Sequence, residues 1–260
     1  MPGRLDSLPS LNGVTMTSLL GVAAIGYFGY RFARRAPRLR RSMPARAEYQ
    51  RNAPPATRAM IRGEAGEAAV RAELRRVLAG LCGNDFYLHD GAVLVQHAPG
   101  TAFPTAEIDH IAITPFGIFV IETKNWSGQI APAANADDVV RTGADGVAEV
   151  RRSPLAQNRT KVAFLNRKLP PVWPIEGLGV FAAADCTLHP GLPLPLIHIN
   201  ELALWLRLRR SDFGTARKKP VNVRVAWEAI MLNASTCDFE IDEHRKRLRT
   251  HAKDHANDAV

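Results

Sequence analysis

Three charged side chains stand at the ends of two apolar runs in the segment IDHIAITPFGIFVIETKNWSG, residues 108–128. Asp109 precedes the run IAIT, and Glu122 and Lys124 follow the run GIFVI. Two carboxylates can bind a divalent cation through oxygen, and a neighbouring lysine can orient water or stabilise charge that develops on a phosphate. These groups suit metal-dependent hydrolysis of a phosphodiester. The alternative is a strand-end ion pair between Glu122 and Lys124, which contributes little to stability.

The two runs predict antiparallel neighbouring strands joined by a short Pro-Phe-Gly turn. Because side chains alternate along a strand, Glu122 and Lys124 are expected on one face and Thr123 on the other. The continuous apolar run IFVI before Glu122 is typical of a strand that is covered on both faces. We therefore expect Asp109 and Glu122 to lie close enough to bind one ion. His110 is expected to point away from Asp109, as a packed or hydrogen-bonded histidine.

Helices are predicted on either side of these strands. Residues 63–81 place apolar side chains at helical spacing on one face, and residues 154–168 begin with a proline after the candidate N-cap Ser153. Further strands are predicted at 86–95, either straight or bent at Asp90-Gly91, and at 177–184 and 196–199. Residues 126–130 are expected to continue the second central strand after a break. Residues 132–148 indicate a hairpin or surface excursion, and Asn200 is expected to cap a last helix over 201–210. This order predicts an α/β domain with a mixed central sheet flanked by helices.

The net charge of +9 is unevenly distributed along the chain. Residues 1–62 hold eleven of the 34 basic and two of the 25 acidic residues, so residues 63–260 carry 23 of each sign. Overall charge is therefore no evidence that the domain binds nucleic acid. The three cysteines form no CxxC pair, which argues against a disulfide framework or a zinc site. The charged tail from Asp242, which contains three histidines, is interpreted as a solvated helix or frayed end.

An apolar stretch, VTMTSLLGVAAIGYFGY, occupies residues 14–30 and is followed by RFARRAPRLRR. We interpret residues 14–32 as a single transmembrane helix and residues 1–13 as a short extracytoplasmic amino terminus. The arginines after the apolar stretch place the remaining chain in the cytoplasm, at a bacterial-type inner membrane. Residues 33–60 are a basic Pro- and Arg-rich linker that can lie against anionic lipid. The alternative for the apolar stretch is a buried helix of a soluble domain.

The run AEIDHIAITPFGIFVIETKNWSGQI, with GEAGEAAV before it and a Pro-x-x-Gln helix after it, closely resembles the nuclease-related domain (NERD) family. This family is a branch of the PD-(D/E)xK nuclease superfamily. The resemblance covers roughly residues 58–170 and implies a restriction-endonuclease-like fold. We assign residues 61–212 to this domain and residues 213–260 to a carboxy-terminal extension with a charged tail.

The resemblance implies a role for five residues. Asp109, Glu122 and Lys124 match the core catalytic residues of the family, and Glu67 matches a further carboxylate near the metal. Gln157 matches the glutamine of the later helix, which would contact a metal-bound water or a substrate phosphate. The implied metal ligands are Glu67, Asp109 and Glu122, and the implied cofactor is Mg²⁺ or Mn²⁺.

Three basic residues near Gln157 are candidates for nucleic-acid contacts: Arg152, Arg159 and Lys161. Lys161 lies one turn after Gln157 on the same helix face, although a solvated lysine is an equal alternative. The resulting expectation is a membrane-anchored, divalent-metal-dependent nuclease, with DNA favoured over RNA. The alternative is a non-cleaving module that keeps the fold and binds nucleic acid or a protein partner.

Three residues beside these motifs can be explained by a structural role rather than a functional one. Glu64 could be mistaken for Glu67, and its simpler role is a charge that complements the helix dipole. Glu107 either supports the site from the strand face of Asp109 or is a charge at the start of that strand. Asn125 is expected to cap the end of the second strand.

Overall fold

The computed structural model describes residues 57–216 and 218–257. Its central sheet has five strands in the order β1-β4-β5-β9-β11. The strands are β1 (Tyr87–Leu88), β4 (His110–Thr114), β5 (Gly117–Lys124), β9 (Ile175–Phe181) and β11 (Leu196–His198). β4 is antiparallel to β1 and β5, whereas β9 is parallel to β5 and β11 is parallel to β9. The predicted mixed sheet and the predicted antiparallel pairing of its two central strands are both confirmed.

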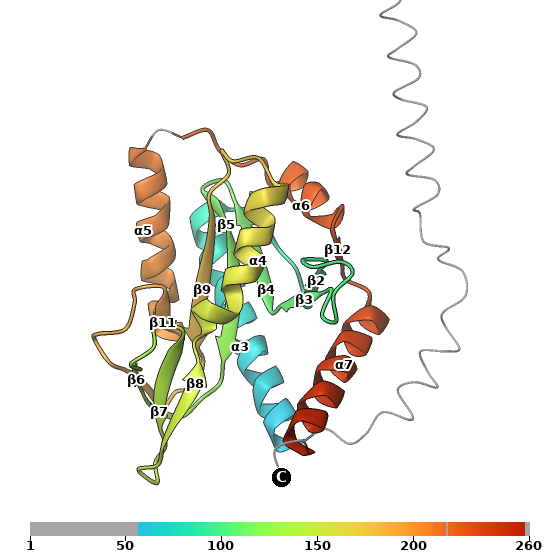
Figure 1. Ribbon diagram of the computed structural model, residues 1–260. Coiled ribbons are helices and arrows are strands. Elements are labelled where there is room, and N and C mark those ends of the chain that lie inside the picture. The colour runs from blue at the N-terminus through green and yellow to red at the C-terminus, as the bar shows by residue number, and fades with distance from the viewer. Residues whose placement is uncertain (1–56, 217, 258–260) are drawn as a thin grey trace, which may run out of the picture. The chain divides into compact units, whose positions relative to one another are not determined.

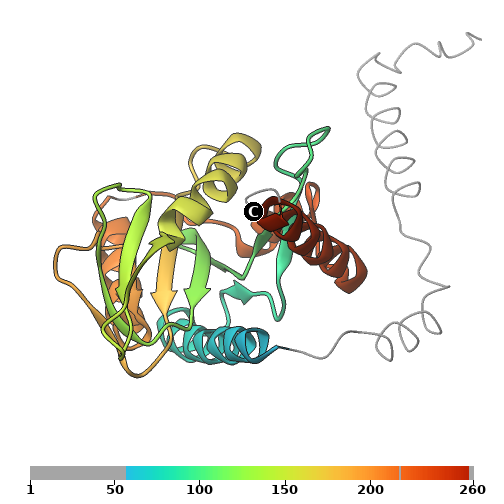
Figure 2. The same cartoon turned by 60° about the horizontal axis from the view of Figure 1, so that its bottom comes forward.

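Helices cover both faces of this sheet (Figures 1 and 2). One face packs against α3 (Arg58–Cys82) and α5 (Leu202–Thr215), and the other against α4 (Pro154–Lys168) and α6 (Val223–Met231). The alternation along β5 explains the two cores. Phe119 and Ile121 face α3 and α5, while Ile118 and Val120 face α4 and α6. A strand buried on both faces therefore delivers Glu122 and the residues after it to the edge of the core.

The helix α3 begins at Arg58, earlier than the predicted start at residue 63. Thr57 is its N-cap and accepts a hydrogen bond from the backbone N–H of Met60. The helix ends at Gly83, whose φ of 61° suits the left-handed conformation that commonly terminates helices. Its buried stripe comprises Gly66, Val70, Leu74, Val77 and Leu78. This stripe packs against the central sheet, as the apolar spacing predicts.

The prediction of one continuous strand over 86–95 is wrong, whereas the bend considered at Asp90-Gly91 is confirmed. The segment divides into β1 and β2 (Val93–Val95), with the bend between them. β2 belongs to a separate three-stranded sheet, where it pairs with β3 (Ala106–Ile108) and β12 (Ala234–Ser235). Asp109 is the single residue between β3 and β4, and therefore lies where the chain passes from one sheet into the other.

A four-stranded sheet in the order β10-β6-β7-β8 lies beside the end of β5. It comprises β6 (Gly128–Pro132), β7 (Asp138–Thr142), β8 (Ala148–Arg152) and β10 (Cys186–Leu188). Residues 126–130 do not continue the second central strand, because β6 pairs in this other sheet. Of the two alternatives for residues 132–148, the hairpin is confirmed as the antiparallel pair β7–β8, although β8 extends beyond this range to Arg152.

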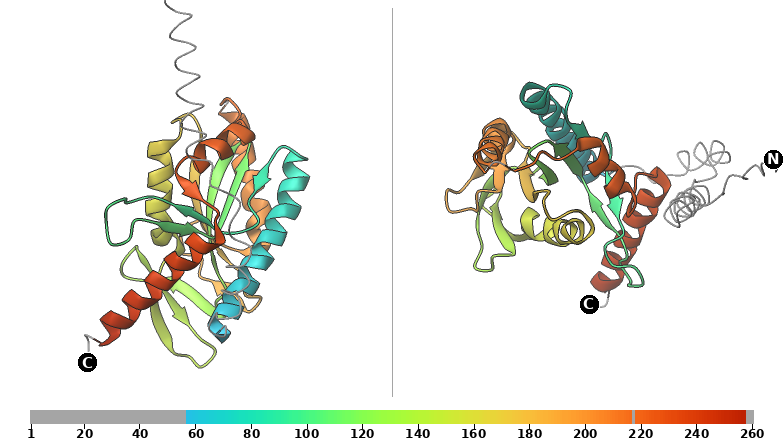
Figure 3. Two further views of the ribbon diagram at one scale, coloured as in Figure 1. Left: turned by 90° about the vertical axis from the view of Figure 1, so that its right-hand side faces the viewer. Right: turned by 90° about the horizontal axis from the view of Figure 1, so that it is seen from above.

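The carboxy-terminal part differs most from the expectation. His198, rather than Asn200, caps the 3-10 turn η1 (Ile199–Glu201) that leads into α5, because its side chain accepts a hydrogen bond from the backbone of Asn200. α6 was not predicted. The tail forms α7 (Asp238–Asn257), which packs against β2 and β3 (Figure 3). A solvated or frayed tail is wrong for His244, which is buried and hydrogen-bonded to Thr105 at 2.9 Å.

None of the helices in residues 57–216 and 218–257 has the length and apolar character that a membrane crossing requires. The predicted transmembrane helix at 14–32, the amino terminus before it and most of the linker at 33–60 lie outside the described residues.

Candidate active site

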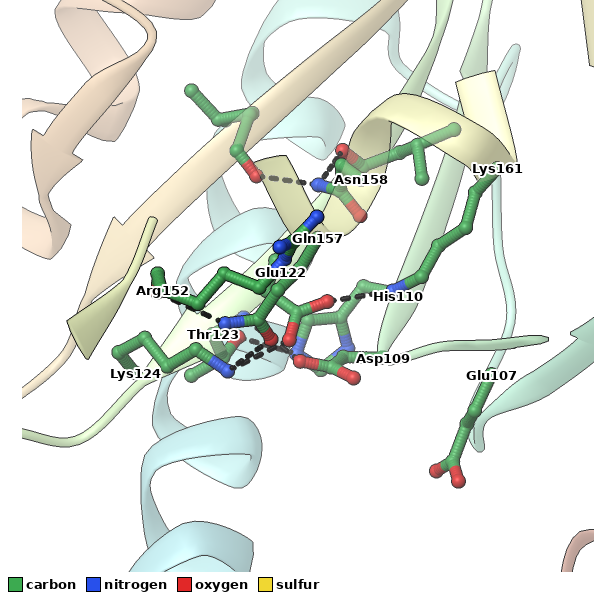
Figure 4. Close-up of polar contacts among 12 residues, drawn as sticks. Glu107, Asp109, His110, Glu122, Thr123, Lys124, Arg152, Gln157, Asn158 and Lys161 are labelled. Atoms are coloured by element: carbon green, nitrogen blue, oxygen red, sulfur yellow. Dashed lines mark hydrogen bonds and ion pairs between the residues drawn. The ribbon is translucent and has the colours of Figure 1, made fainter. Parts of the chain in front are cut away.

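Three residues at the carboxyl end of β5 and the start of α4 meet through one amine (Figure 4). The Nζ of Lys124 donates to Oε1 of Glu122 at 2.7 Å and to Oε1 of Gln157 at 2.9 Å. Glu122 and Lys124 share a strand face, as the alternation predicts, while Thr123 lies on the other face and bonds to His110. The sequence therefore placed the strand residues correctly, and α4 supplies the glutamine.

A second lysine completes the surroundings of Glu122. The Nζ of Lys161 donates to Oε2 of Glu122 at 2.6 Å, and its side chain is only 8% exposed. The solvated-lysine alternative is therefore wrong. Burial acts to raise the pKa of Glu122, but the charges and hydrogen bonds of Lys161 and Lys124 outweigh it and lower that pKa. Glu122 is thus a buried carboxylate that its two lysines keep ionised.

Asp109 has a different environment, although it lies beside Glu122. Its Oδ2 accepts a hydrogen bond from the backbone N–H of Thr123 at 2.8 Å, and no lysine or arginine in the described residues forms an ion pair with it. Burial, followed by the charge of Glu122, raises the pKa of Asp109 to about 7. Two neighbouring carboxyls thus have pKa values shifted in opposite directions, an arrangement that is common at catalytic sites.

The amide of Gln157 is oriented from both ends. Its Nε2 donates to the backbone carbonyl of Arg152 at 3.1 Å, which directs its Oε1 towards Lys124. The helix itself is held on the sheet by Asn158, whose Nδ2 donates to the carbonyls of Val120 and Leu178 at 2.9 and 3.1 Å. The position of Gln157 therefore follows from a buried anchor one residue later.

Gly179 allows the start of α4 to approach the sheet closely. A Cβ at this position would come within 2.6 Å of the ring of Pro154 and of the side chain of Leu196. Any larger residue would push α4 outwards, and with it the glutamine that bonds to Lys124.

Glu67 reaches the site from α3. The helix approaches the end of β5 at Gly66, where a Cβ would lie 2.6 Å from the Cβ of Asn125. Asn125 does not cap the strand; its Nδ2 instead donates to the carbonyl of Arg62 at 2.7 Å and ties α3 to the end of β5. Burial, opposed by Arg245, raises the pKa of Glu67. Its carboxyl forms no hydrogen bond or ion pair with any residue that the structure describes.

Two cavities meet at these carboxyls. One, of about 430 Å³, extends towards Trp126 and the β7–β8 hairpin. The other, of about 650 Å³, extends between the start of α3, α4 and α7. Glu67, Asp109 and Glu122 line both, so the three carboxyls lie at their junction. Glu64 lines only the larger cavity.

The three carboxyls are of the chemical type that binds a hard cation, but they are not arranged as a complete set of metal ligands. Carboxylate oxygens are the ligands that Mg²⁺ and Mn²⁺ prefer, and the carboxyls of Asp109 and Glu67 have no basic side chain bonded to them in the described part of the chain. Within the same residues, no three His, Cys, Asp or Glu side chains converge tightly enough to form a metal site. The two carboxylate oxygens of Glu122 instead accept hydrogen bonds from Lys124 and Lys161.

Residues 62–182 match the family model of the nuclease-related domain (NERD). The chain contains a nuclease-related domain. The match begins within α3 and ends one residue after β9, so it includes all the residues described around Glu122. It agrees with the resemblance to PD-(D/E)xK nucleases that the motifs indicate, and it excludes α5, α6 and α7.

One further similarity covers a shorter part of the chain. A segment of 70 residues is 39% identical to an uncharacterized protein of Bacillus anthracis. The segment is 26% of this chain and 29% of that protein, so the chain covers less than a third of this relative. No solved structure matches the chain.

The remaining predicted residues of the nuclease-related domain are dispersed. Arg152 lines the larger cavity. Arg159 instead forms a surface ion pair with Asp137 and lines neither cavity. Glu107 lies apart from the cluster (Figure 4) and pairs with Arg245 of α7. The site therefore gains one basic residue from α4, Lys161, and a wall from α7.

Sequence reasoning missed Asn158 and Arg245 altogether. The only sequence signal for the anchoring role of Asn158 is that it is a polar residue on the sheet-facing side of an amphipathic helix. Arg245 has none, because it is 138 residues from its partner Glu107.

Proposed function

We propose that the nuclease-related domain is a divalent-metal-dependent nuclease that hydrolyses phosphodiester bonds of nucleic acid, with DNA favoured over RNA. The observation that carries this proposal is the position of the Lys124 amine. It is held between Glu122 and Gln157, beside Asp109, on the wall of the smaller cavity and inside the segment that matches the family.

In this proposal each residue has a defined task. Asp109, Glu67 and Glu122 hold Mg²⁺ or Mn²⁺ through their carboxylate oxygens. The ion would supply charge that polarises the phosphorus centre and lowers the pKa of a bound water. Lys124 stabilises the negative charge that develops on the phosphoryl oxygens, and Gln157 keeps its amine in place.

Lys161 holds Glu122 at a fixed position. A buried lysine bonded to one carboxylate oxygen restrains the side chain and keeps it ionised. Phosphate binding by Lys161 is less well supported, because its amine is buried and already paired.

The test is cleavage by the purified full-length protein, with Mg²⁺ or Mn²⁺, of labelled single-stranded DNA, double-stranded DNA and RNA. Asp109→Ala and Lys124→Ala, each with an unchanged circular dichroism spectrum, are the inactive controls. We expect cleavage that requires the metal, is lost in both variants and is faster on DNA. Cleavage that persists in both variants would contradict the proposal, since another site or protein would then be responsible.

A second candidate is a module that binds nucleic acid or a protein without cleaving. The observation in its favour is that both oxygens of Glu122 are occupied by lysines. Binding of nucleic acid without cleavage of any of the three substrates, in the presence of either metal, would favour this candidate.

We also propose that residues 14–32 anchor the protein in a bacterial-type inner membrane, with the nuclease-related domain in the cytoplasm and the basic linker on anionic lipid. The support is the order of the sequence: an uncharged apolar stretch followed by arginines. Recovery of the full-length protein in washed membranes after alkaline extraction is the expected result. Recovery in the soluble fraction would contradict it.

A further inference from the structure

The helix α7 lies outside the family match, yet it is fixed against the candidate site. Arg245 donates to both carboxylate oxygens of Glu107 through its Nε at 3.1 and 3.0 Å, and its Nη2 also donates to Oε1 of Glu107. One residue earlier, His244 bonds to Thr105, and one turn before that Ile241 is buried. Three consecutive contacts on one helix face therefore set the rotation of α7 about its axis.

This rotation directs a second arginine into the larger cavity. On an α-helix, the residue four positions after Arg245 lies on the same face, and Arg249 does line the cavity together with Arg245 and Leu248. Arg247 is on the outer face and lines neither cavity. Two arginines of the same short helical segment thus differ in whether they face the carboxyls.

Arg249 has no anionic partner among the described residues, whereas Arg245 has Glu107. On another part of the same cavity wall, Arg152 at the end of β8 also forms no ion pair with a described residue. An exposed guanidinium without a carboxylate keeps its full charge and its five donors for a ligand. The larger cavity therefore has carboxyls at one end and, on walls from β8 and α7, guanidinium groups that no described carboxylate pairs with.

We propose that α7 is part of the substrate-binding surface of the nuclease-related domain and that Arg249 and Arg152 bind backbone phosphates of a nucleic-acid strand in the larger cavity. The proposal rests on the proposed function and deepens it by naming the residues that hold the substrate. Arg245 is a positioning residue, because its charge is used by Glu107. Arg249 is a contact residue, because its guanidinium is available to a phosphate.

This arrangement also explains how a domain without excess positive charge can bind a polyanion. Residues 63–260 carry equal numbers of basic and acidic residues, but binding depends on where unpaired charge gathers. Several surface arginines elsewhere are paired, as Arg159 is with Asp137 and Arg151 with Glu149. Arg152 and Arg249, on the walls of the larger cavity, form no ion pair with any described residue.

The test measures binding separately from cleavage. Fluorescence anisotropy of a labelled single-stranded DNA oligonucleotide would be followed with the full-length protein in EDTA, over a series of salt concentrations. The variants are Arg249→Ala and Arg152→Ala, with Arg247→Ala as the matched control from the outer face of α7. Unchanged melting temperatures would verify that each variant is folded.

We expect Arg249→Ala and Arg152→Ala each to weaken binding by about fivefold or more at low salt, and to reduce the slope of log affinity against log salt by about 0.7 per residue. Arg247→Ala should bind as the wild type does. Equal affinities for Arg249→Ala and Arg247→Ala, with cleavage by the wild type intact, would overturn the role of α7 and leave the nuclease proposal standing. Failure of the wild type both to bind and to cleave would overturn both.

Discussion

The opposite pKa shifts of Asp109 and Glu122 predict that Asp109→Asn stabilises the protein at alkaline pH. The side chain of Asp109 is held in its place by one backbone hydrogen bond, from Thr123. The asparagine carbonyl can accept the same bond, so the substitution removes the titratable group with little change of shape. It thereby removes the cost of ionising a buried carboxyl beside the carboxylate of Glu122.

The sign follows from the pKa in the folded state. Asp109 has a pKa of about 7 in the folded protein against 3.8 for an exposed aspartate, so the folded state binds this proton more tightly than the unfolded state does. Its contribution to stability is complete below about pH 4 and is lost as the pH rises to about 7. The difference between the two pKa values corresponds to about 4 kcal/mol at most, and about 2 kcal/mol of it is already lost at about pH 5.

The assay is urea denaturation of wild type and Asp109→Asn in EDTA, between about pH 5 and about pH 8. We expect the unfolding free energy of the variant, relative to wild type, to increase by about 2 kcal/mol over this range. The control is Asp137→Asn: a hydrogen bond from Arg159 lowers the pKa of Asp137, so this carboxyl stays ionised throughout the range and its variant should differ from wild type by a constant amount. A constant difference between wild type and Asp109→Asn across the range would refute the raised pKa and the electrostatic account of the site.

Three further predictions can be checked by urea denaturation at neutral pH. Lys161→Ala should cost about 3 kcal/mol, since it removes a buried ion-pair partner, whereas Arg159→Ala should have a much smaller effect because its ion pair is exposed; equal costs would contradict this. Gly66→Ala should destabilise by about 1–3 kcal/mol, since its Cβ would lie 2.6 Å from a side-chain carbon at the end of β5, while Gly63→Ala, with open space around it, should be neutral or stabilising; the reverse order would be inconsistent with the close approach of α3. Asn158→Ala should cost about 2–3 kcal/mol through two lost hydrogen bonds to buried carbonyls, and a cost below about 0.5 kcal/mol would argue against its anchoring role.

The central hairpin could be predicted because its determinants are local. Two apolar runs and the turn between them fix β4 and β5, and the alternation of side chains then places Glu122 and Lys124 on one face. α4 was also predictable, because Ser153 and Pro154 mark its start and the next turn carries the glutamine. The part of the site made by residues close in sequence could therefore be predicted from the sequence.

The segment before the hairpin was not predictable in the same way. The run FYLHDGAVLV reads as a single strand because nothing in its composition reveals that its two halves pair in different sheets. The chain leaves one sheet and enters the other around Asp109, and only tertiary pairing decides this. For Glu107 the sequence left two roles open, support of the site or a charge at the start of its strand, and it instead pairs with a helix whose partnership no local pattern predicts.

The charges around Glu122 have a consequence for cation binding under the proposed function. Without a cation, two lysines already balance Glu122, and the raised pKa of Asp109 means that this carboxyl is partly protonated near neutral pH. A carboxyl must be deprotonated to bind a hard cation, so binding there is expected to release protons near pH 7. The same two lysines must yield part of their bonding to Glu122 if that carboxylate is to contact the ion. The lysines thus keep a buried carboxylate ionised and available at a site where burial alone would protonate it.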